Sequence, residues 1–209
     1  MGRVALLSCL FVLLCGIAGA EGPAPKVALA ESEAVRKNGV DFQVVVTPKW
    51  ATPTDQNGTP VSLSLKVTNH STGDLQLNIF DTINIQMKDA AGTPLTYRYA
   101  RDGTRNPTPV LVRKDASALI DYSAKLLPVA AKDGPFRLIG YDKSGGEWCF
   151  DHLKSGKYTI NMNYDDARFG DSHAVVPTPA PDAKDVPFWH GQCATKEVAI
   201  EIADEHAAP

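Results

Sequence analysis

The residues that most constrain the fold are 61–69, VSLSLKVTN, in which apolar and polar side chains alternate. A period of two places Val61, Leu63, Leu65 and Val67 on one face of a strand and the polar residues on the other. Runs with strand character recur between turn-forming residues, at 40–48, 75–80, 83–89 and 196–204. Seven or more short strands, with turns every 8–12 residues or so, predict an all-β antiparallel sandwich.

The segment KVALAESEAVRK (26–37) has features of both a helix and a strand. Its alanines and glutamates favour a helix. Asn38-Gly39 follows it and is a strong hairpin signal, and VDFQVVVTP (40–48) comes directly after. We therefore predict that 26–37 supplies the first strand of a hairpin.

Residues 152–164, HLKSGKYTINMNY, carry the pattern of a tyrosine corner. Leu153 and Gly156 precede Tyr158, which opens an alternating strand. In immunoglobulin-like sandwiches such a tyrosine bonds back to nearby backbone. The alternative is a buried tyrosine that merely follows a turn. Ile160 stands where antibody domains carry a cysteine, so their inter-sheet disulfide is absent here.

The first twenty residues have the composition of a secretory signal peptide. Arg3 precedes an apolar run, 4–17, and a small-x-small site, AGA, at 18–20. We expect a signal peptide (1–20) and a single secreted or periplasmic domain (21–209) with its core at about 40–204. No other run is apolar enough to span a membrane. The net charge of −3 and the lack of a basic stripe argue against nucleic acid as a partner.

The two cysteines that follow the signal segment, Cys149 and Cys193, are candidates for a disulfide. An exported protein with two cysteines most simply pairs them. The bridge would close a loop of about 45 residues, worth roughly 4 kcal/mol in the chain-entropy model. The alternative is two buried free thiols.

A long segment, 165–195, separates the last two predicted strands and contains the proline-rich tract VVPTPAPDAKDVP. We expect a long loop here, because proline removes the donors that a central strand needs. Phe188 and Trp189 follow the tract. They either form an aromatic platform for a sugar or peptide or anchor the loop to the core.

The stretch YDDARFGDSH (164–173) is the strongest candidate for a metal site. Asp165, Asp171 and His173 could contribute to a loose calcium site, although the spacing does not fit an EF-hand. Zinc held by His173, His190 and an aspartate is a second alternative. The interpretation we favour is a hydrated turn, because aspartate and glycine form turns for reasons of their own. We therefore expect no metal and no cofactor.

Two longer stretches resemble known exported proteins. LSLKVTNHSTGDLQLNIFDTINIQMKDAAGTPL resembles the opening strands of secreted bacterial immunoglobulin-like β-sandwich proteins and is similar to the BsuPI-type proteinase-inhibitor domain. GGEWCFDHLKSGKYTINMNY and FWHGQCATKEVAIEI resemble the closing strands of such proteins. The resemblance covers roughly residues 60–203. It implies a secreted, immunoglobulin-like antiparallel β-sandwich and assigns no residue an inhibitory role.

These observations favour a non-catalytic module for binding or adhesion, with an unidentified protein or carbohydrate as its partner. No G-x-S-x-G motif is present, so we expect no catalytic residues. One alternative is a proteinase-inhibitor-like domain that presents residues 99–109 or the long segment. The other is a metal-dependent or hydrolytic enzyme that uses Asp171, His173 or His190.

Overall fold

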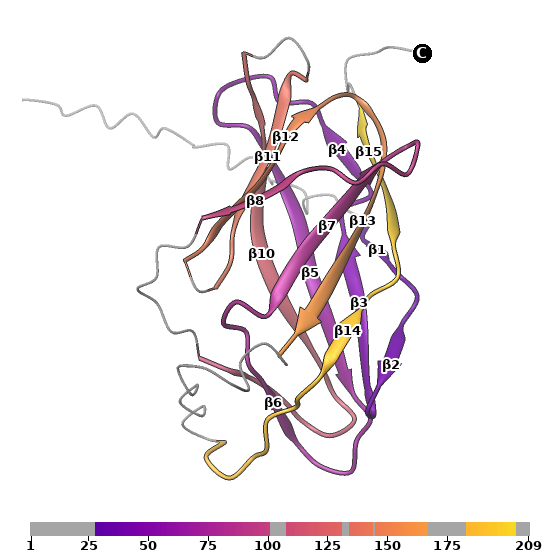
Figure 1. The fold of residues 1–209 in the computed structure, drawn as a ribbon, viewed down its shortest axis with the longest axis vertical. Coiled ribbons are helices and arrows are strands. Elements are labelled where there is room, and N and C mark those ends of the chain that lie inside the picture. Colours follow the sequence, from indigo (N-terminus) through magenta and orange to yellow (C-terminus); the bar gives the residue numbers. More distant parts are fainter. Residues whose placement is uncertain (1–27, 101–107, 131–133, 144, 167–182, 204–209) are drawn as a thin grey trace, which may run out of the picture.

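The computed structural model describes residues 28–100, 108–130, 134–143, 145–166 and 183–203, and every element in them is a strand (Figure 1). The expected signal peptide lies outside these residues. Within the described part of the chain, no helix has the length and apolar character needed to cross a membrane.

The larger sheet has β3 (Val40–Val46) near one edge, where both β1 (Ala30–Glu31) and β2 (Val35–Lys37) pair with it. From β3 the strand order continues through β5 (Thr59–Asn69), β10 (Ser117–Pro128), β11 (Phe136–Tyr141), β12 (Glu147–Leu153) and β8 (Tyr97–Ala100). All neighbours in this sheet are antiparallel.

The smaller sheet is built around β13 (Gly156–Asp165). β7 (Ile83–Asp89) pairs with one side of it, and β14 (Gln192–Ala194) and β15 (Val198–Ala203) share the other side. β4 (Lys49–Ala51) joins β15 in a parallel pair. A short ladder of β6 (Leu75–Leu77) with β9 (Val110–Val112) lies at one end of the molecule (Figure 1).

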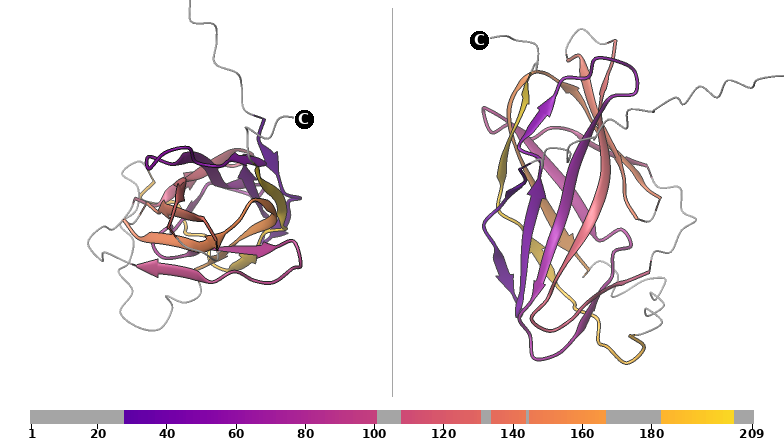
Figure 2. Two further views of the ribbon diagram at one scale, coloured as in Figure 1. Left: turned by 90° about the horizontal axis from the view of Figure 1, so that it is seen from above. Right: turned by 180° about the vertical axis from the view of Figure 1, so that it is seen from behind.

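The two sheets face each other across one apolar core (Figure 2). The alternation in β5 explains why: Val61, Leu63, Leu65 and Val67 are each at most 4% exposed. The predicted all-β antiparallel sandwich is therefore confirmed. In the smaller sheet, β13 lies between β7 and β15. In the larger sheet, β10, β11 and β12 step away from β5 in chain order.

The hairpin predicted at Asn38-Gly39 is present between β2 and β3. Both turn residues have positive φ, 48° and 77°, as the tight hairpin turn requires. Among the described residues 28–37, Ala30–Glu31 and Val35–Lys37 form strands. The strand prediction is thus confirmed for these two short stretches, both of which pair with β3, and the turn joins Val35–Lys37 to it directly.

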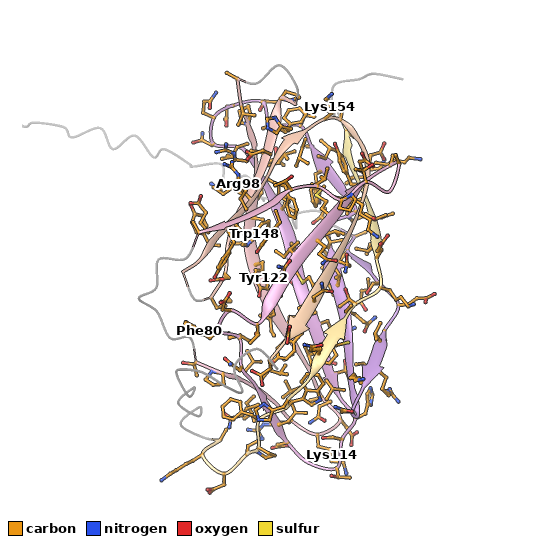
Figure 3. The ribbon with its side chains drawn as sticks, viewed as in Figure 1. Phe80, Arg98, Lys114, Tyr122, Trp148 and Lys154 are labelled. Atoms are coloured by element: carbon orange, nitrogen blue, oxygen red, sulfur yellow. The ribbon has the colours of Figure 1, made fainter. Side chains whose placement is uncertain are left out.

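Tyr158 joins the two sheets at the passage from β12 to β13. Its hydroxyl donates to the carbonyl of Lys154 and accepts from the Lys154 amide, each at 2.9 Å. These backbone contacts are those of a tyrosine corner. Leu153 is fully buried beside it, and Gly156 has a φ of 147° that favours glycine. Lys154 marks this end of the molecule in Figure 3.

Candidate functional site

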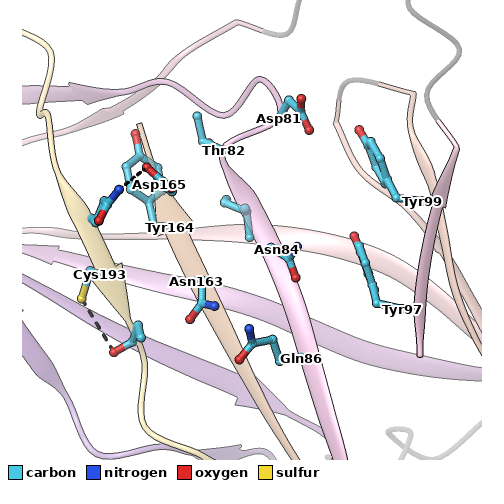
Figure 4. Close-up of a pocket in the computed structure, with 13 residues that line it drawn as sticks. Asp81, Thr82, Asn84, Gln86, Tyr97, Tyr99, Asn163, Tyr164, Asp165 and Cys193 are labelled. Carbon is cyan, nitrogen blue, oxygen red and sulfur yellow. Dashed lines mark hydrogen bonds between the residues drawn. The ribbon is translucent and has the colours of Figure 1, made fainter. Parts of the chain in front are cut away.

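A polar pocket of about 620 Å³ opens along the smaller sheet and extends to the edge of the larger one. Its walls come from β7, β13, β14 and β8, and its lining includes Asn84, Gln86, Asn163, Asp165, Tyr97 and Tyr99 (Figure 4). The volume is within the usual range for a small-molecule site. Neither lysine nor arginine is present among the described residues that line it.

One wall of the pocket is an array of amide side chains, and strand alternation produces it. In β13, Ile160, Met162 and Tyr164 are buried in the core, so Asn161 and Asn163 take the opposite face. In β7, Ile85 and Met87 point inward in the same way, which leaves Asn84 and Gln86 outside. Register then places Asn163 directly opposite Asn84, and Asn161 opposite Gln86.

The amide array is partly ordered by its own hydrogen bonds. Asn161 Nδ2 donates to Gln86 Oε1 at 3.3 Å and lies 3.5 Å from Asn163 Oδ1. Each side-chain amide offers one acceptor oxygen and two N–H donors. The wall can therefore both donate to and accept from a hydroxyl-rich ligand, without contributing a charge.

The facing wall consists of two tyrosines on the edge strand β8. The rings of Tyr97 and Tyr99 are nearly parallel, 9° apart in plane, with centroids 6.3 Å apart. Tyr97 also packs against the buried ring of Phe150. Figure 4 shows both side chains reaching from β8 toward the amide-bearing strands.

Contacts outside the pocket fix the orientation of Tyr99. Its hydroxyl donates to Asp142 Oδ2 at 2.9 Å. Gly146 lies against the ring, and a Cβ at that position would come within 2.3 Å of the hydroxyl oxygen. Burial, followed by the hydrogen bond and charge of Asp142, raises the pKa of Tyr99. Burial likewise raises the pKa of Tyr97. Both phenols therefore remain protonated at neutral pH.

The far end of the pocket is formed where β13 meets β14. Gln192 Nε2 donates to Asp165 Oδ1 at 3.1 Å, and the two residues are directly paired in the ladder. Of the residues in YDDARFGDSH, Asp165 is thus part of the pocket wall. Asp171 and His173 lie outside the described residues. Within the described chain no three His, Cys, Asp or Glu side chains gather as metal ligands would.

The neighbouring residue, Asp166, is buried and takes part in a different network. Its carboxylate accepts from Asn78 Nδ2 at 3.1 Å and contacts His190 Nδ1 at 2.5 Å. The His190 side chain is itself 75% exposed. Asp165 is the last residue of β13 and Asp166 directly follows it, and the two carboxylates have different partners.

The predicted Cys149–Cys193 disulfide is wrong: both cysteines are free and buried. Strand alternation explains the result. Trp148 and Phe150 belong to the core, so Cys149 between them lies on the outer side of β12. Cys193 belongs to the core side of β14 in the other sheet. Burial raises the pKa of the Cys193 thiol, so the thiol stays protonated.

The aromatic platform predicted at Phe188 and Trp189 is not available as such, because Trp189 is only 7% exposed. Its ring packs between Phe42 and Tyr164, with centroids 5.1 Å and 5.4 Å away. The Trp189 amide donates to the carbonyl of Gln76 at 2.8 Å. Trp189 therefore anchors the long segment to the core, the alternative given above.

Gln76 is fully buried and completes that anchor. Its side-chain amide donates to the carbonyls of Ala183 and Val186, at 2.9 Å and 2.8 Å. Its backbone amide donates to Pro187 at 2.9 Å. One glutamine thus satisfies three carbonyls of a proline-rich segment that cannot form a ladder of its own.

Sequence reasoning missed the pocket because it followed only the inward half of each alternating strand. The signal was present in INIQMKD and INMNYD, where every outward position from Asn84 to Gln86 and from Asn161 to Asn163 is an amide. The tyrosines of YRYA (97–100) were a second signal. Their convergence on the amides depends on how the two sheets meet.

Comparisons with known proteins identify no family. No family model matches the chain, and no curated protein matches it significantly. A solved structure with similarity is FetP of the uropathogenic E. coli strain F11, expressed recombinantly in the periplasm of E. coli. It is 11% identical, and the match covers 84% of this chain and 95% of FetP. The TM-score of 0.26 is too low to carry any argument about this chain.

Proposed function

We propose that this chain is an exported, non-catalytic binding module and that its polar pocket holds a carbohydrate. One observation carries the proposal: the Tyr97–Tyr99 pair and the amide array of Asn84, Gln86 and Asn163 line the same pocket. A sugar ring has an apolar C–H face and a rim of hydroxyls. Tyrosine rings suit the face, and amides, as combined donors and acceptors, suit the rim.

The charge of the pocket favours a neutral sugar over a phosphate-bearing ligand such as a nucleic acid. The described lining carries no lysine or arginine to meet phosphates. Two carboxylates, Asp81 and Asp165, also line it and disfavour anionic ligands, whereas the amides and phenols of the two facing walls are uncharged and suit hydroxyl groups. Export agrees with such a role, because the expected signal peptide delivers the domain to a compartment where envelope or extracellular glycans are found.

The test is a calorimetric titration of the mature protein with a panel of neutral oligosaccharides. We expect Tyr97→Ala to weaken binding about tenfold or more, because it removes an aromatic face. Tyr141→Ala is the matched control: Tyr141 is 52% exposed and lies outside this pocket. Equal losses in the two variants, or no binding by the whole panel, would overturn the proposal.

A second variant tests the site without removing a contact to the ligand. Gly146 lies behind Tyr99, and an added Cβ would collide with its hydroxyl. We therefore expect Gly146→Ala to turn the Tyr99 ring and weaken sugar binding, while catalysis of glycoside cleavage stays undetectable in both proteins. Turnover of any sugar in the panel would favour the enzyme alternative.

A further inference from the structure

A second, smaller pocket of about 330 Å³ lies on the opposite face of the edge strand β8. Strand alternation separates the two sites: Tyr97 and Tyr99 face the polar pocket, whereas Arg98 between them faces outward. Arg98, Arg137, Asp151 and His152 contribute to this second pocket. Figure 3 labels Arg98 on this part of the larger sheet.

A β-bulge in β12 assembles the pocket. Phe150 pairs with Leu138 and Leu153 with Phe136, so Asp151 and His152 together oppose the single residue Arg137. His152 has a φ of 61°, which is unusual for a residue with a side chain inside a strand. Bulges of this kind redirect side chains and occur frequently next to functional sites.

The backbone around the bulge is specified closely by the sequence. Gly134 passes directly over His152, and a Cβ on Gly134 would lie 2.2 Å from the His152 carbonyl carbon. A glycine is thus required where the two segments cross. Backbone held in a sparsely populated conformation is more common at functional sites than elsewhere.

The electrostatics of this pocket are net positive. Arg98 on β8 and Arg137 on β11 flank Asp151 on β12, and each donates to a different oxygen of its carboxylate. The Asp151 side chain is 16% exposed, whereas Arg98 and Arg137 are 57% and 38% exposed. Two guanidinium charges therefore meet one carboxylate, and both remain accessible to solvent.

Asp151 orients the two guanidinium groups without using up their donors. A guanidinium has five N–H donors, and the contacts to Asp151 involve Nη2 of Arg98 and Nε of Arg137. Arg98 also hydrogen-bonds Cys149. Arg98 and Arg137 reach the small pocket from two different strands, with His152 beside them. Planar guanidinium donors in this arrangement match the oxygens of phosphate and sulfate.

We propose that this pocket binds a tetrahedral oxyanion, either a free phosphate or sulfate ion or the same group carried as an ester. The site is independent of the carbohydrate proposal, because it lies on the other face of β8 and shares no described residue with the polar pocket. Its ligand is defined by charge and geometry: a compact anion that replaces water between Arg98 and Arg137.

Titration with sodium phosphate at constant ionic strength, followed by NMR shifts of the Asp151 and His152 amides, tests the proposal. Two variants should act in opposite directions. Arg137→Gln removes a charged donor and should weaken binding about tenfold. Asp151→Asn keeps the shape but removes the competing negative charge, and should strengthen binding about fivefold. Thermal melts of both variants show whether each is folded.

The outcomes separate cleanly. No saturable shift with phosphate or sulfate, or equal effects of the two variants on a folded protein, would show that the cluster is only a structural ion-pair network and would overturn the proposal. Glucose 6-phosphate distinguishes the sources: tighter binding than inorganic phosphate indicates an ester-borne anion, and weaker binding indicates the free ion, with either result supporting the site. Tyr97→Ala should leave phosphate binding unchanged, whatever its effect on sugars.

Discussion

The two ends of β13 are held in opposite ways. At the N-terminal end, the Tyr158 hydroxyl bonds to the backbone of Lys154, four residues earlier. Just beyond the C-terminal end, Asp166 is bonded by Asn78, 88 residues earlier in the chain, and by His190, 24 residues later. The side-chain hydrogen bonds at one end of the strand are thus local, and those at the other end come from distant parts of the chain.

The polar pocket lies at the end of β13 that distant residues hold. Asn163 and Asp165, which line it, belong to the C-terminal half of β13, where β14 replaces β15 as the neighbouring strand. The tyrosine corner instead closes the end of the sandwich near Lys154. Several distant segments of the chain meet at this end of the strand. They bring different polar side chains together, and a binding site requires such a combination.

The largest effect is expected when the anchor of the distant end is removed. Trp189→Ala should cost about 3–5 kcal/mol of unfolding free energy, because it empties a core site between two aromatic rings. The carbonyls of Ala183 and Val186, which accept hydrogen bonds from Gln76, belong to the segment that Trp189 anchors, so these bonds should be lost with the anchor. Hydrogen exchange should show lost protection at the Gln76 and Trp189 amides before any change at the tyrosine corner.

Phe188→Ala is the matched control for the anchor. Phe188 precedes Trp189 in the same segment but is only half-buried, so its removal should cost much less. If the two variants destabilise the protein equally, the segment is held by its backbone and not by the Trp189 ring. Uniform loss of protection throughout β13 in Trp189→Ala would show that the two ends unfold together.

Removal of the tyrosine-corner hydroxyl should have a smaller effect. Tyr158→Phe deletes one donor and one acceptor but keeps the ring in the core, so we expect a loss of about 1 kcal/mol. Chemical denaturation measures it. The sugar affinity of the polar pocket should not change, because the corner lies at the other end of β13. A loss of affinity would show that the two ends are coupled.

The same division explains how much of the fold the sequence predicts. The strand at 61–69, the turn at Asn38-Gly39 and the corner at Tyr158 depend on residues within a few positions of one another. Their patterns are therefore readable along the chain. The parallel pair of β4 with β15 depends on Lys49–Ala51 and Glu201–Ala203, which no local pattern connects.

The candidate site was predictable only in part for the same reason. Asp165 was singled out, although as a metal ligand, and its partner Gln192 was not. Cys149 and Cys193 were joined because an even number of cysteines suggests pairing, yet pairing also requires that the two side chains face each other. Alternation within β12 and β14 directs them to different sides of the sheets, and this depends on register that sequence spacing alone does not contain.

The smallest predicted effect concerns an ion pair across the N-terminal half of β13. Lys88 lies opposite Thr159 in the ladder, and its Nζ is 2.5 Å from Glu197 Oε1. The hydrogen bond from Lys88, and then that from Thr159, hold the pKa of Glu197 below its ordinary value of 4.5. The two side chains are 37% and 42% exposed, so the pair contributes less than about 1 kcal/mol.

A carboxyl group whose pKa is lowered by folding adds stability above its unfolded pKa, and that stability is lost as the pH falls through the folded value. We therefore expect Glu197→Gln to be slightly less stable than the parent at neutral pH and to converge with it in acid, below the ordinary carboxyl pKa. Urea unfolding across this pH range measures the difference.

Asn84→Ala, on the amide-bearing half of the sheet, should shift stability without changing its pH dependence. Parallel curves for Glu197→Gln and the parent would show that the ion pair contributes nothing to stability. The outer faces of the two halves of the sheet around β13 would then differ only in the polar groups that they offer to a ligand.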